Sequence, residues 1–412
     1  MSKVSFLEKL LEGAEVEWKP IKKILVRAKG TKITAGKMKE IHKDGAPLKI
    51  FAGGKTTAFV NFEDIPEKDI HRYPSIIVKS RGVIEFEYYD KPFSHKSEMW
   101  SYYSDNTSIN IKYIYHFLKM NEAYFRGIAS RMQMPQIATP DTDKYHVPIP
   151  CPDNPKKSSK IQSEIVRILD TFTELTAELT AELTARKKQY DYYRDRLFTF
   201  DESEVEWKSL GDLTIKSYSG ATPKAGNLRY YENGTIPWLR TQEVKFCDIE
   251  KVTVKITQAA IEETAVKWVP KNCVIVAISG ATAGRSAVNK IPLTTNQHCL
   301  CLEINEKLAD YRYVFHWVSK NYELLKGMGR GARGDLNSSI IKDFKIPVPY
   351  SDDFKKSLYE QERVSNTLDK FDTLTNSIRS GLPREVELRQ KQFEYYRDQL
   401  FDFPKTDKEA LK

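Results

Sequence analysis

The stretch Glu15-Val16-Glu17-Trp18-Lys19 occurs a second time as Glu204-Val205-Glu206-Trp207-Lys208, and this repetition decides the fold. Three other stretches are repeated in the same order: residues 147–150 as 346–349, residues 168–172 as 367–371, and residues 192–198 as 395–401. The repeated unit covers about half of the chain, which is far longer than the repeat of a solenoid protein. The sequence therefore predicts a duplicated pair of domains.

The repeat is close at its edges and weak between them. The offset is 189 residues from Trp18 to Trp207, 199 from Pro150 to Pro349, and 203 from Tyr193 to Tyr396. The two repeats share their edges and differ in the sequence between them, so we expect the two domains to recognise different targets.

Composition narrows the class of protein. With 412 residues, 40% hydrophobic and 29% charged, the chain is long enough for several globular domains. No apolar run approaches the roughly 20 residues needed to span a bilayer, and the first residues do not resemble a signal peptide. The five cysteines show neither a disulfide framework nor zinc spacing, so we expect a cytoplasmic protein. A net charge of +9 favours a polyanionic partner.

Two regions have the pattern of long helices. Between residues 156 and 200 the apolar side chains alternate in steps of four and three, and neither Gly nor Pro interrupts them. This predicts one helix of about 40 residues. The pattern returns in residues 352–403, where Gly381 and Pro383 are expected to break it. Mixed strand, turn and helix patterns fill the two remaining regions, where we predict a hairpin over residues 75–86 and a helix over residues 311–325.

The resulting order is globule, helix, globule, helix. If the two helices pair they must be antiparallel, which brings the chain ends together in a cyclic, pseudo-twofold arrangement. We predict an α+β protein in which two mixed α/β domains are separated by two long antiparallel coiled-coil helices. The expected boundaries are 1–148 and 204–347 for the globules, and 149–203 and 348–412 for the helical spacers.

Two stretches resemble nucleotide- or phosphate-binding motifs, but one lacks the structural surroundings of its motif and the other lacks the full sequence. Residues 329–334 match the dinucleotide pattern GxGxxG, but no βαβ unit surrounds them, so a basic loop is expected. Residues 280–286 resemble a phosphate-binding loop but are one residue short and have Arg where that motif needs Lys. A backbone contact from this loop to a DNA phosphate remains an open alternative. The sequence has no Asn-Pro-Pro-aromatic tetrapeptide for amino-methylation and no acidic cluster for two metals. We expect a chain without a catalytic centre.

The loops of both globules hold side chains that read base edges, since Arg pairs with guanine and Asn or Gln with adenine. Any one of them could equally be an ordinary solvated residue; together they favour DNA. In the first globule the candidates are Lys55, Lys79, Arg81, Lys96, Arg131, Gln133 and Gln136. In the second they are Thr222, Lys224, Arg240, Thr241, Gln242, Ser279, Arg285, Asn296, Gln297, Arg330 and Arg333. The helix ends supply candidates for contacts with partner proteins: Tyr190, Tyr193, Arg194, Phe393, Tyr396 and Arg397.

The tetrad Thr-Ala-Glu-Leu occurs twice in succession, at residues 176–179 and 180–183. It is a helix-favouring sequence, and it can also act as a length adjuster. One tetrad adds about 6 Å of rise and about 40° of rotation. A DNA base pair contributes about 3.4 Å and roughly 35°, so one tetrad corresponds to about one or two base pairs.

These residues resemble the specificity subunits of type I restriction-modification systems, and most closely the type IC branch. The resemblance extends over essentially the whole chain. It is strongest in the Trp stretches, in residues 148–155 and 162–170, in the tetrads, in residues 186–190, and in 381–385 through 397–398. In the second globule it includes Thr222-Pro223, residues 236–238, Ser279-Gly280 and Asn296-Gln297.

The resemblance implies two target recognition domains that each read one half of a bipartite, asymmetric DNA site. The helices would set the spacer and bind two modification subunits, which use S-adenosylmethionine to methylate adenine. Restriction subunits that hydrolyse ATP, with Mg²⁺, would join them. This chain would bind no cofactor or metal itself and would work in the bacterial cytoplasm.

Other interpretations remain open. The chain could be a stand-alone sequence-specific DNA-binding protein, or a methylation specificity factor without a nuclease partner. A self-sufficient methyltransferase or nuclease and a coiled-coil scaffold that never touches bases are the remaining alternatives.

Overall fold

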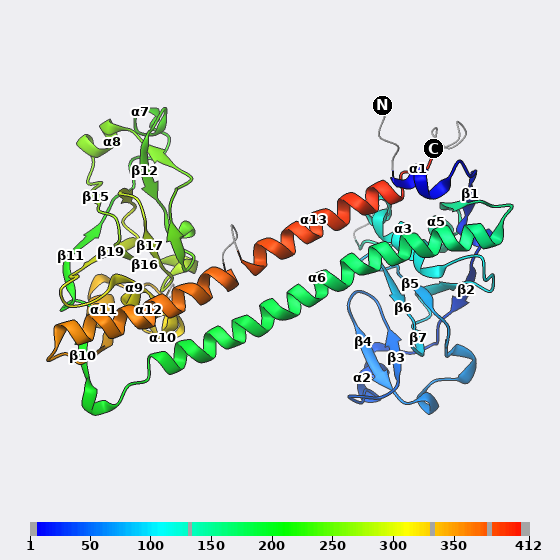
Figure 1. Cartoon of the computed structure of the whole chain (residues 1–412), viewed down its shortest axis with the longest axis horizontal. Helices are drawn as coiled ribbons and strands as arrows, with labels where there is room; N and C mark the ends of the chain where they lie inside the picture. Colours follow the sequence, from blue (N-terminus) through cyan, green and yellow to red (C-terminus); the bar gives the residue numbers. More distant parts are fainter. Residues whose placement is uncertain (1–5, 131–133, 330–333, 377–380, 405–412) are drawn as a thin grey trace. The chain divides into compact units, whose positions relative to one another are not determined.

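The computed structural model describes residues 6–130, 134–329, 334–376 and 381–404. The chain forms two compact units. Unit 1 consists of Met1–Leu179 and Val386–Lys412, and unit 2 consists of Thr180–Glu385. Each unit therefore contains one globule together with parts of both helical regions (Figure 1). The four predicted segment boundaries stay a prediction.

Unit 1 holds two sheets and a two-stranded ribbon. The larger sheet is antiparallel and has the order β2 (Val26–Lys29), β8 (Trp100–Tyr103), β5 (Ser75–Lys79), β6 (Glu85–Tyr89). The smaller has the order β4 (Thr57–Val60), β3 (Leu48–Phe51), β7 (Phe93–His95), and its β3 and β7 are parallel. The ribbon pairs β1 (Val16–Pro20) with β9 (His146–Pro150). The predicted hairpin at residues 75–86 is confirmed as β5 and β6.

Unit 2 repeats this strand order and adds one strand to each sheet. The larger sheet runs β11 (Thr214–Ser219), β19 (Cys299–Ile304), β16 (Val274–Ala277), β17 (Ser286–Asn289), β13 (Cys247–Ile249). The smaller runs β14 (Lys255–Ile256), β12 (Ile236–Leu239), β18 (Leu293–Thr295), β15 (Trp268–Val269), with β12 and β18 parallel. The ribbon pairs β10 (Val205–Ser209) with β20 (Lys345–Pro349). The added strands are β13 and β15.

Most of the short helices also correspond between the units. Unit 1 has α1 (Phe6–Leu11), α2 (Ala35–Glu40), α3 (Ile111–Met120), α4 (Glu122–Ala129) and α5 (Thr139–Asp143). Unit 2 has α7 (Leu228–Tyr231), α8 (Gln258–Glu263), α9 (Tyr311–Lys320), α10 (Tyr322–Gly327) and α11 (Ser338–Asp343). Helix α2 corresponds to α7, and α3, α4 and α5 correspond to α9, α10 and α11. Single 3₁₀ turns occupy Ile21–Lys23, Phe62–Asp64, Glu67–Asp69, Glu202–Glu204, Thr241–Glu243 and Gly280–Thr282. The helix expected over residues 311–325 is interrupted at Asn321, the boundary of α9 and α10.

The long helices match their sequence pattern. Helix α6 (Pro155–Leu197) has 43 residues, which confirms the prediction of one uninterrupted helix. The second region forms α12 (Phe354–Asn376) and α13 (Leu382–Leu400). Gly381, immediately before α13, has φ +82°, a left-handed conformation that glycine adopts at little cost. The predicted break at this point is therefore confirmed.

Each hydrophobic core joins a globule to both helical regions. The core of unit 1 includes Ile165 from the first half of α6 and Phe401, which follows α13. The core of unit 2 includes Leu368 of α12 and Phe198, which follows α6. In each unit the early part of one helical region thus shares a core with the end of the other. Antiparallel helices are expected to show this arrangement.

Two aromatic stacks show the same pairing. In unit 1, Phe172 stacks on Tyr396 with ring centroids 5.2 Å apart and an interplanar angle of 20°. In unit 2, Tyr193 stacks on Phe371 at 5.4 Å and 23°. Such offset ring pairs add to the stability that buried area alone provides. The predicted α+β class, with duplicated domains and long paired helices, is confirmed.

No helix in the described part of the chain is long and apolar enough to cross a membrane. Across the same residues, no group of three or more His, Cys, Asp or Glu side chains is placed to hold a metal ion.

Candidate nucleic-acid interface

The candidate residues of unit 2 gather where two parallel strands end. Strands β12 and β18 run in the same direction, with Leu239 opposite Thr295. The segments that follow them, from Arg240 and from Asn296, therefore leave the sheet at the same edge. The backbone N–H of Asn296 donates to the carbonyl oxygen of Leu239 at 3.1 Å, which fixes the two segments together.

The loop containing Thr222 lies against this edge. The Thr222 hydroxyl donates to Oε1 of Gln297 at 2.7 Å, and the Ser219 hydroxyl donates to the Gln297 carbonyl at 3.2 Å. A Cβ on Gly220 would stand 1.7 Å from the carbonyl oxygen of Thr295, so only glycine permits this approach. Lys224, two residues after Thr222, is exposed.

The connection between β16 and β17 reaches the same place. The N–H of Ile278 donates to the carbonyl of His298 at 2.9 Å, which puts the neighbouring Ser279 beside Gln297. Arg285, at the end of this connection, is half-buried. The Gly280 N–H donates to Asp335 at 3.0 Å and is thus occupied within the unit, so the suggested phosphate contact by this turn stays a prediction.

Arg240 is the most constrained member of this set. Its backbone N–H donates to one carboxylate oxygen of Glu243 at 3.3 Å, and the other oxygen accepts the N–H and the hydroxyl of Thr253 at 2.7 and 2.8 Å. These bonds hold the turn that includes half-buried Thr241 and exposed Gln242. Within the described residues the Arg240 Nε–H is buried and has no acceptor. The bonds to Glu243 fix the backbone of Arg240, and its guanidinium carries further N–H donors that suit an external acceptor.

Unit 1 has the same construction with different side chains. Its parallel strands β3 and β7 end before Lys55 and Lys96, and the Lys96 N–H donates to the Phe51 carbonyl at 2.9 Å. The Gly54 N–H donates to the carbonyl of Arg81 at 3.2 Å, and Arg81 forms an isolated bridge with Gln136. Lys55, Arg81 and Gln136 are exposed, while Lys96 is half-buried and pairs with Glu98 at 2.9 Å.

Lys79 does not belong to this edge. It is 7% exposed, and its ammonium lies 3.1 Å from Glu85 and 2.7 Å from Glu87 on the neighbouring strand. Burial opposes its charge, but the hydrogen bonds to Glu87 and Glu85 raise the pKa of Lys79. Its ammonium is thus used in ion pairs within the unit, and its contact with DNA stays a prediction. Arg131, Gln133, Arg330 and Arg333 lie outside the described residues.

The aromatic candidates for partner contacts also pack within their own unit, although Tyr193 and Tyr396 remain 36% and 38% exposed. Tyr190 and Tyr193 contact Phe371, Tyr396 stacks on Phe172, and Phe393 packs against the core of unit 1. Arg194 pairs with Asp191 at 3.0 Å, and Arg397 pairs with Asp398 at 2.7 Å.

The most exposed rings of these segments are instead Tyr192 and Tyr395, at 58% and 62%. They occupy equivalent positions in the repeat. Helical periodicity could have singled them out, because positions 190 and 193 share one face and 192 falls on another.

Comparison with known proteins agrees with this architecture. The model of the type I restriction modification DNA specificity domain matches residues 20–186 and 202–388. The chain is 39% identical over 420 residues to the type I restriction enzyme EcoR124I/EcoR124II specificity subunit of Escherichia coli, covering 99% of both chains. It is 30% identical over 400 residues to the EcoprrI specificity subunit of E. coli, covering 92% of this chain and 93% of that one.

A solved structure shares the fold. The S subunit of a type I restriction-modification system from M. genitalium superposes with a TM-score of 0.63 and 16% identity, covering 95% of this chain and 98% of that one. The matched domain occurs twice, as the internal repeat requires. On the matched domains and the full-length relatives, the chain belongs to the family of type I restriction-modification specificity subunits.

Proposed function

We propose that each unit of this chain reads one half of a bipartite, asymmetric DNA site. The observation that supports this most directly is the shared position of the candidate residues. In both units some of them follow a pair of parallel strands that end at one edge and others lie on segments beside that edge, and the strand order around it is the same. The side chains at the edge differ between the units, so the half-sites are expected to differ.

The chemistry of each edge suits a duplex. Arg240 and Arg81 offer the paired donors that match guanine, whereas Gln242, Gln297 and Gln136 offer the donor and acceptor that match adenine. Lys55 and Lys224 are exposed cations suited to phosphates. The net charge of +9 adds affinity that does not depend on sequence.

We propose further that the long helices set the spacer between the half-sites and bind two modification subunits. Tyr192 and Tyr395 support the second part, because one exposed ring recurs at an equivalent place in each half of the repeat. Two equivalent surfaces on one chain suit two copies of one partner. Adenine methylation with S-adenosylmethionine, and ATP-dependent cleavage with Mg²⁺, would then be the work of the modification and restriction subunits.

An exchange of recognition regions tests the proposal. Replacement of residues 20–146 by the corresponding region of the EcoprrI relative should change one half-site of the methylated motif and leave the other half and the spacer intact. The reciprocal exchange, of residues 209–345, should change only the other half-site. A change in both half-sites after either exchange would refute independent reading by the two units.

A further inference from the structure

In each unit a buried glutamine of a long helix forms hydrogen bonds with the globule: Gln162 of α6 in unit 1 and Gln361 of α12 in unit 2. In unit 1, Oε1 of Gln162 on α6 accepts the N–H of Asn110, the cap of α3, at 2.8 Å. Its Nε2 donates to the carbonyl of Ser108 at 3.0 Å and to the hydroxyl of Ser158 at 2.9 Å. Gln162 is fully buried, so its amide is used for the contact between helix and globule.

Unit 2 repeats this contact in detail. Oε1 of Gln361 on α12 accepts the N–H of Asp310, the cap of α9, at 3.0 Å. Its Nε2 donates to the carbonyl of Leu308 at 3.4 Å and to the Ser357 hydroxyl at 3.0 Å. A buried amide with every partner supplied is costly to disturb, because any change leaves polar groups unpaired.

An aspartate makes a second contact farther along each helix. Asp170 of α6 lies 2.7 Å from the Lys112 ammonium and 3.2 Å from Nε2 of His116, both on α3. Asp369 of α12 accepts hydrogen bonds from Arg312 of α9, at 3.0 Å from Nε to each carboxylate oxygen.

The aspartate of unit 2 also lies 2.6 Å from Nε2 of His316. Burial opposes its ionisation, but the bonds from His316 and Arg312 lower the pKa of Asp369 to about 2. The carboxylate is therefore ionised at neutral pH.

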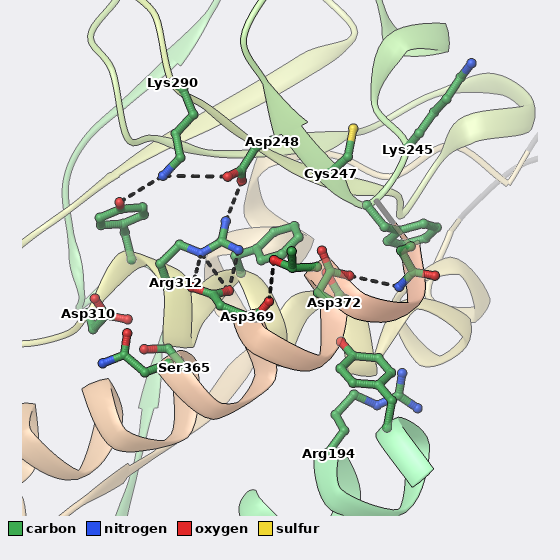
Figure 2. A pocket seen from close by; sticks show the side chains of 18 of the residues that line it. Arg194, Lys245, Cys247, Asp248, Lys290, Asp310, Arg312, Ser365, Asp369 and Asp372 are labelled. Carbon is green, nitrogen blue, oxygen red and sulfur yellow. Dashed lines mark hydrogen bonds and ion pairs between the residues drawn. The ribbon is translucent and has the colours of Figure 1, made fainter. Parts of the chain in front are cut away.

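The contact in unit 2 has an additional tie. Figure 2 shows the Arg312 guanidinium between Asp369 and Asp248, and its Nη1 lies 2.5 Å from the Asp248 carboxylate. Asp248 is on β13, a strand without a counterpart in unit 1, and it also faces Lys290 at 3.8 Å. These residues line a cavity of about 1370 Å³ where α9, α12 and the end of α6 meet. In both units a histidine and a basic side chain of the globule contact the helix aspartate. In unit 2 the basic side chain is the Arg312 guanidinium, which Asp248 also pairs with, whereas in unit 1 it is the Lys112 ammonium.

The two contacts on each helix are eight residues apart, or about 12 Å along the axis. Both helices also bury apolar side chains in the core of their unit, and such packing is not directional. Two directional polar contacts separated along the helix add a defined tilt of the globule and a defined rotation about the helix. On DNA, one base pair of spacer corresponds to about 3.4 Å and roughly 35° of rotation. Discrimination between spacers therefore requires the rotation to be defined more finely than that.

We propose that these glutamines and aspartates are positioning residues that determine which spacer length is accepted. We also propose that the orientation of the globule on its helix is less tightly defined in unit 1 than in unit 2. This inference rests on the proposed reading of a bipartite site. It assigns spacer specificity to the junction between globule and helix in addition to helix length. Half-site specificity stays with the strand-edge loops.

The test uses the full chain assembled with its modification partner. Methylation is measured on two DNA libraries: one keeps both half-sites and varies the spacer by single base pairs, and the other keeps the spacer and randomises the half-sites. D170N and D369N preserve side-chain size but remove the charge. Each should reduce discrimination against spacers one base pair too long or too short by about tenfold, as expected for lost charge-assisted hydrogen bonds. The half-site preferences should not change.

Two further variants complete the design. R363Q removes the exposed pair with Glu360, 2.6 Å apart on α12, and should leave both profiles unchanged. K112R puts a guanidinium beside Asp170, as in unit 2, and should sharpen the spacer profile. An unchanged spacer profile in D170N and D369N, or altered half-sites in either, would overturn the inference. If D170N and D369N do not assemble with the modification partner, K112R becomes the test. An unchanged spacer profile in K112R would then overturn the inference. A wild-type complex that methylates no bipartite motif would instead refute the proposed function.

Discussion

The Nε1–H of Trp18 donates a 3.0 Å hydrogen bond to the carbonyl oxygen of Pro404. Trp18 lies in the first strand of unit 1 and Pro404 follows its last helix, so the two ends of the chain are built into the same unit. Unit 1 is therefore completed only by residues from the end of the chain. Unit 2 is closed by the corresponding residues after α6.

The chain end should therefore stabilise unit 1 selectively. Phe401 is buried, and its ring lies 5.3 Å from Tyr113 and 5.5 Å from Phe117. F401A should cost about 3–5 kcal/mol and reduce hydrogen-exchange protection in unit 1. F198A, the equivalent change beside Tyr313, should do the same to unit 2. Equal loss of protection in both units from F401A would contradict this assignment.

Arg240 should determine one position of one half-site. R240A removes the donors that would face a base, and we expect a loss of about 1–3 kcal/mol in discrimination at that position. K224A, in the same unit, should weaken binding to all sequences alike, because an exposed ammonium suits a phosphate. Methylation of a randomised library by the complete complex measures both. Uniform weakening by R240A would mean that the guanidinium contacts phosphate.

The number of tandem tetrads should determine the length of the accepted spacer. Deletion of residues 180–183 removes about one helical turn and about 6 Å of rise from α6. The accepted spacer should become shorter by about one or two base pairs while both half-sites are retained. The methylated motif of the variant shows the spacer length and the sequence of each half-site. A changed half-site would show that these residues do more than set distance.

The exposed tyrosines should matter for assembly and not for folding. Y192A and Y395A each remove a ring that is more than half exposed, so the thermal stability of the free chain should change little. Each should weaken binding of one modification subunit, and the double variant should weaken both, as titration calorimetry would measure. Y193A is the internal control: it removes the stack on Phe371 and should lower the stability of unit 2. Full affinity in the double variant would exclude these rings from the interface.

Unit 1 should lose stability in mild acid. His95 is fully buried, with Nε2 3.2 Å from the Ser101 hydroxyl. Burial lowers the pKa of His95 to about 4; the Lys96 carbonyl and Asp69 oppose the shift, and His71 adds to it. A depressed pKa contributes stability that is complete above about pH 6.5 and is lost as pH falls toward 4, so about 2 kcal/mol should disappear between pH 7 and 5. H95Q should flatten this dependence in urea unfolding measured across that range.

Local signals explain what the sequence predicted. The length of α6, the break at Gly381 and the hairpin of β5 and β6 follow from periodicity and from residues that act on their neighbours. The ion pair of Lys79 with Glu85 was accessible by the same logic, because the hairpin register puts Glu85 directly opposite Lys79.

The common strand order of the globules was not accessible. It depends on pairings such as β3 with β7, whose residues are more than forty apart in the chain and whose sequences have diverged between the repeats. The candidate loops were found by composition, whereas their meeting at one parallel-strand edge follows only from the topology.

We propose that one chain presents two different half-site readers at a fixed spacing. Methylome sequencing of cells that express this chain with its modification partner is the decisive measurement. We expect adenine methylation at a single asymmetric motif of two specific halves separated by a spacer of constant length. An assembled complex that methylates a continuous motif, a symmetric motif or no defined motif would contradict it.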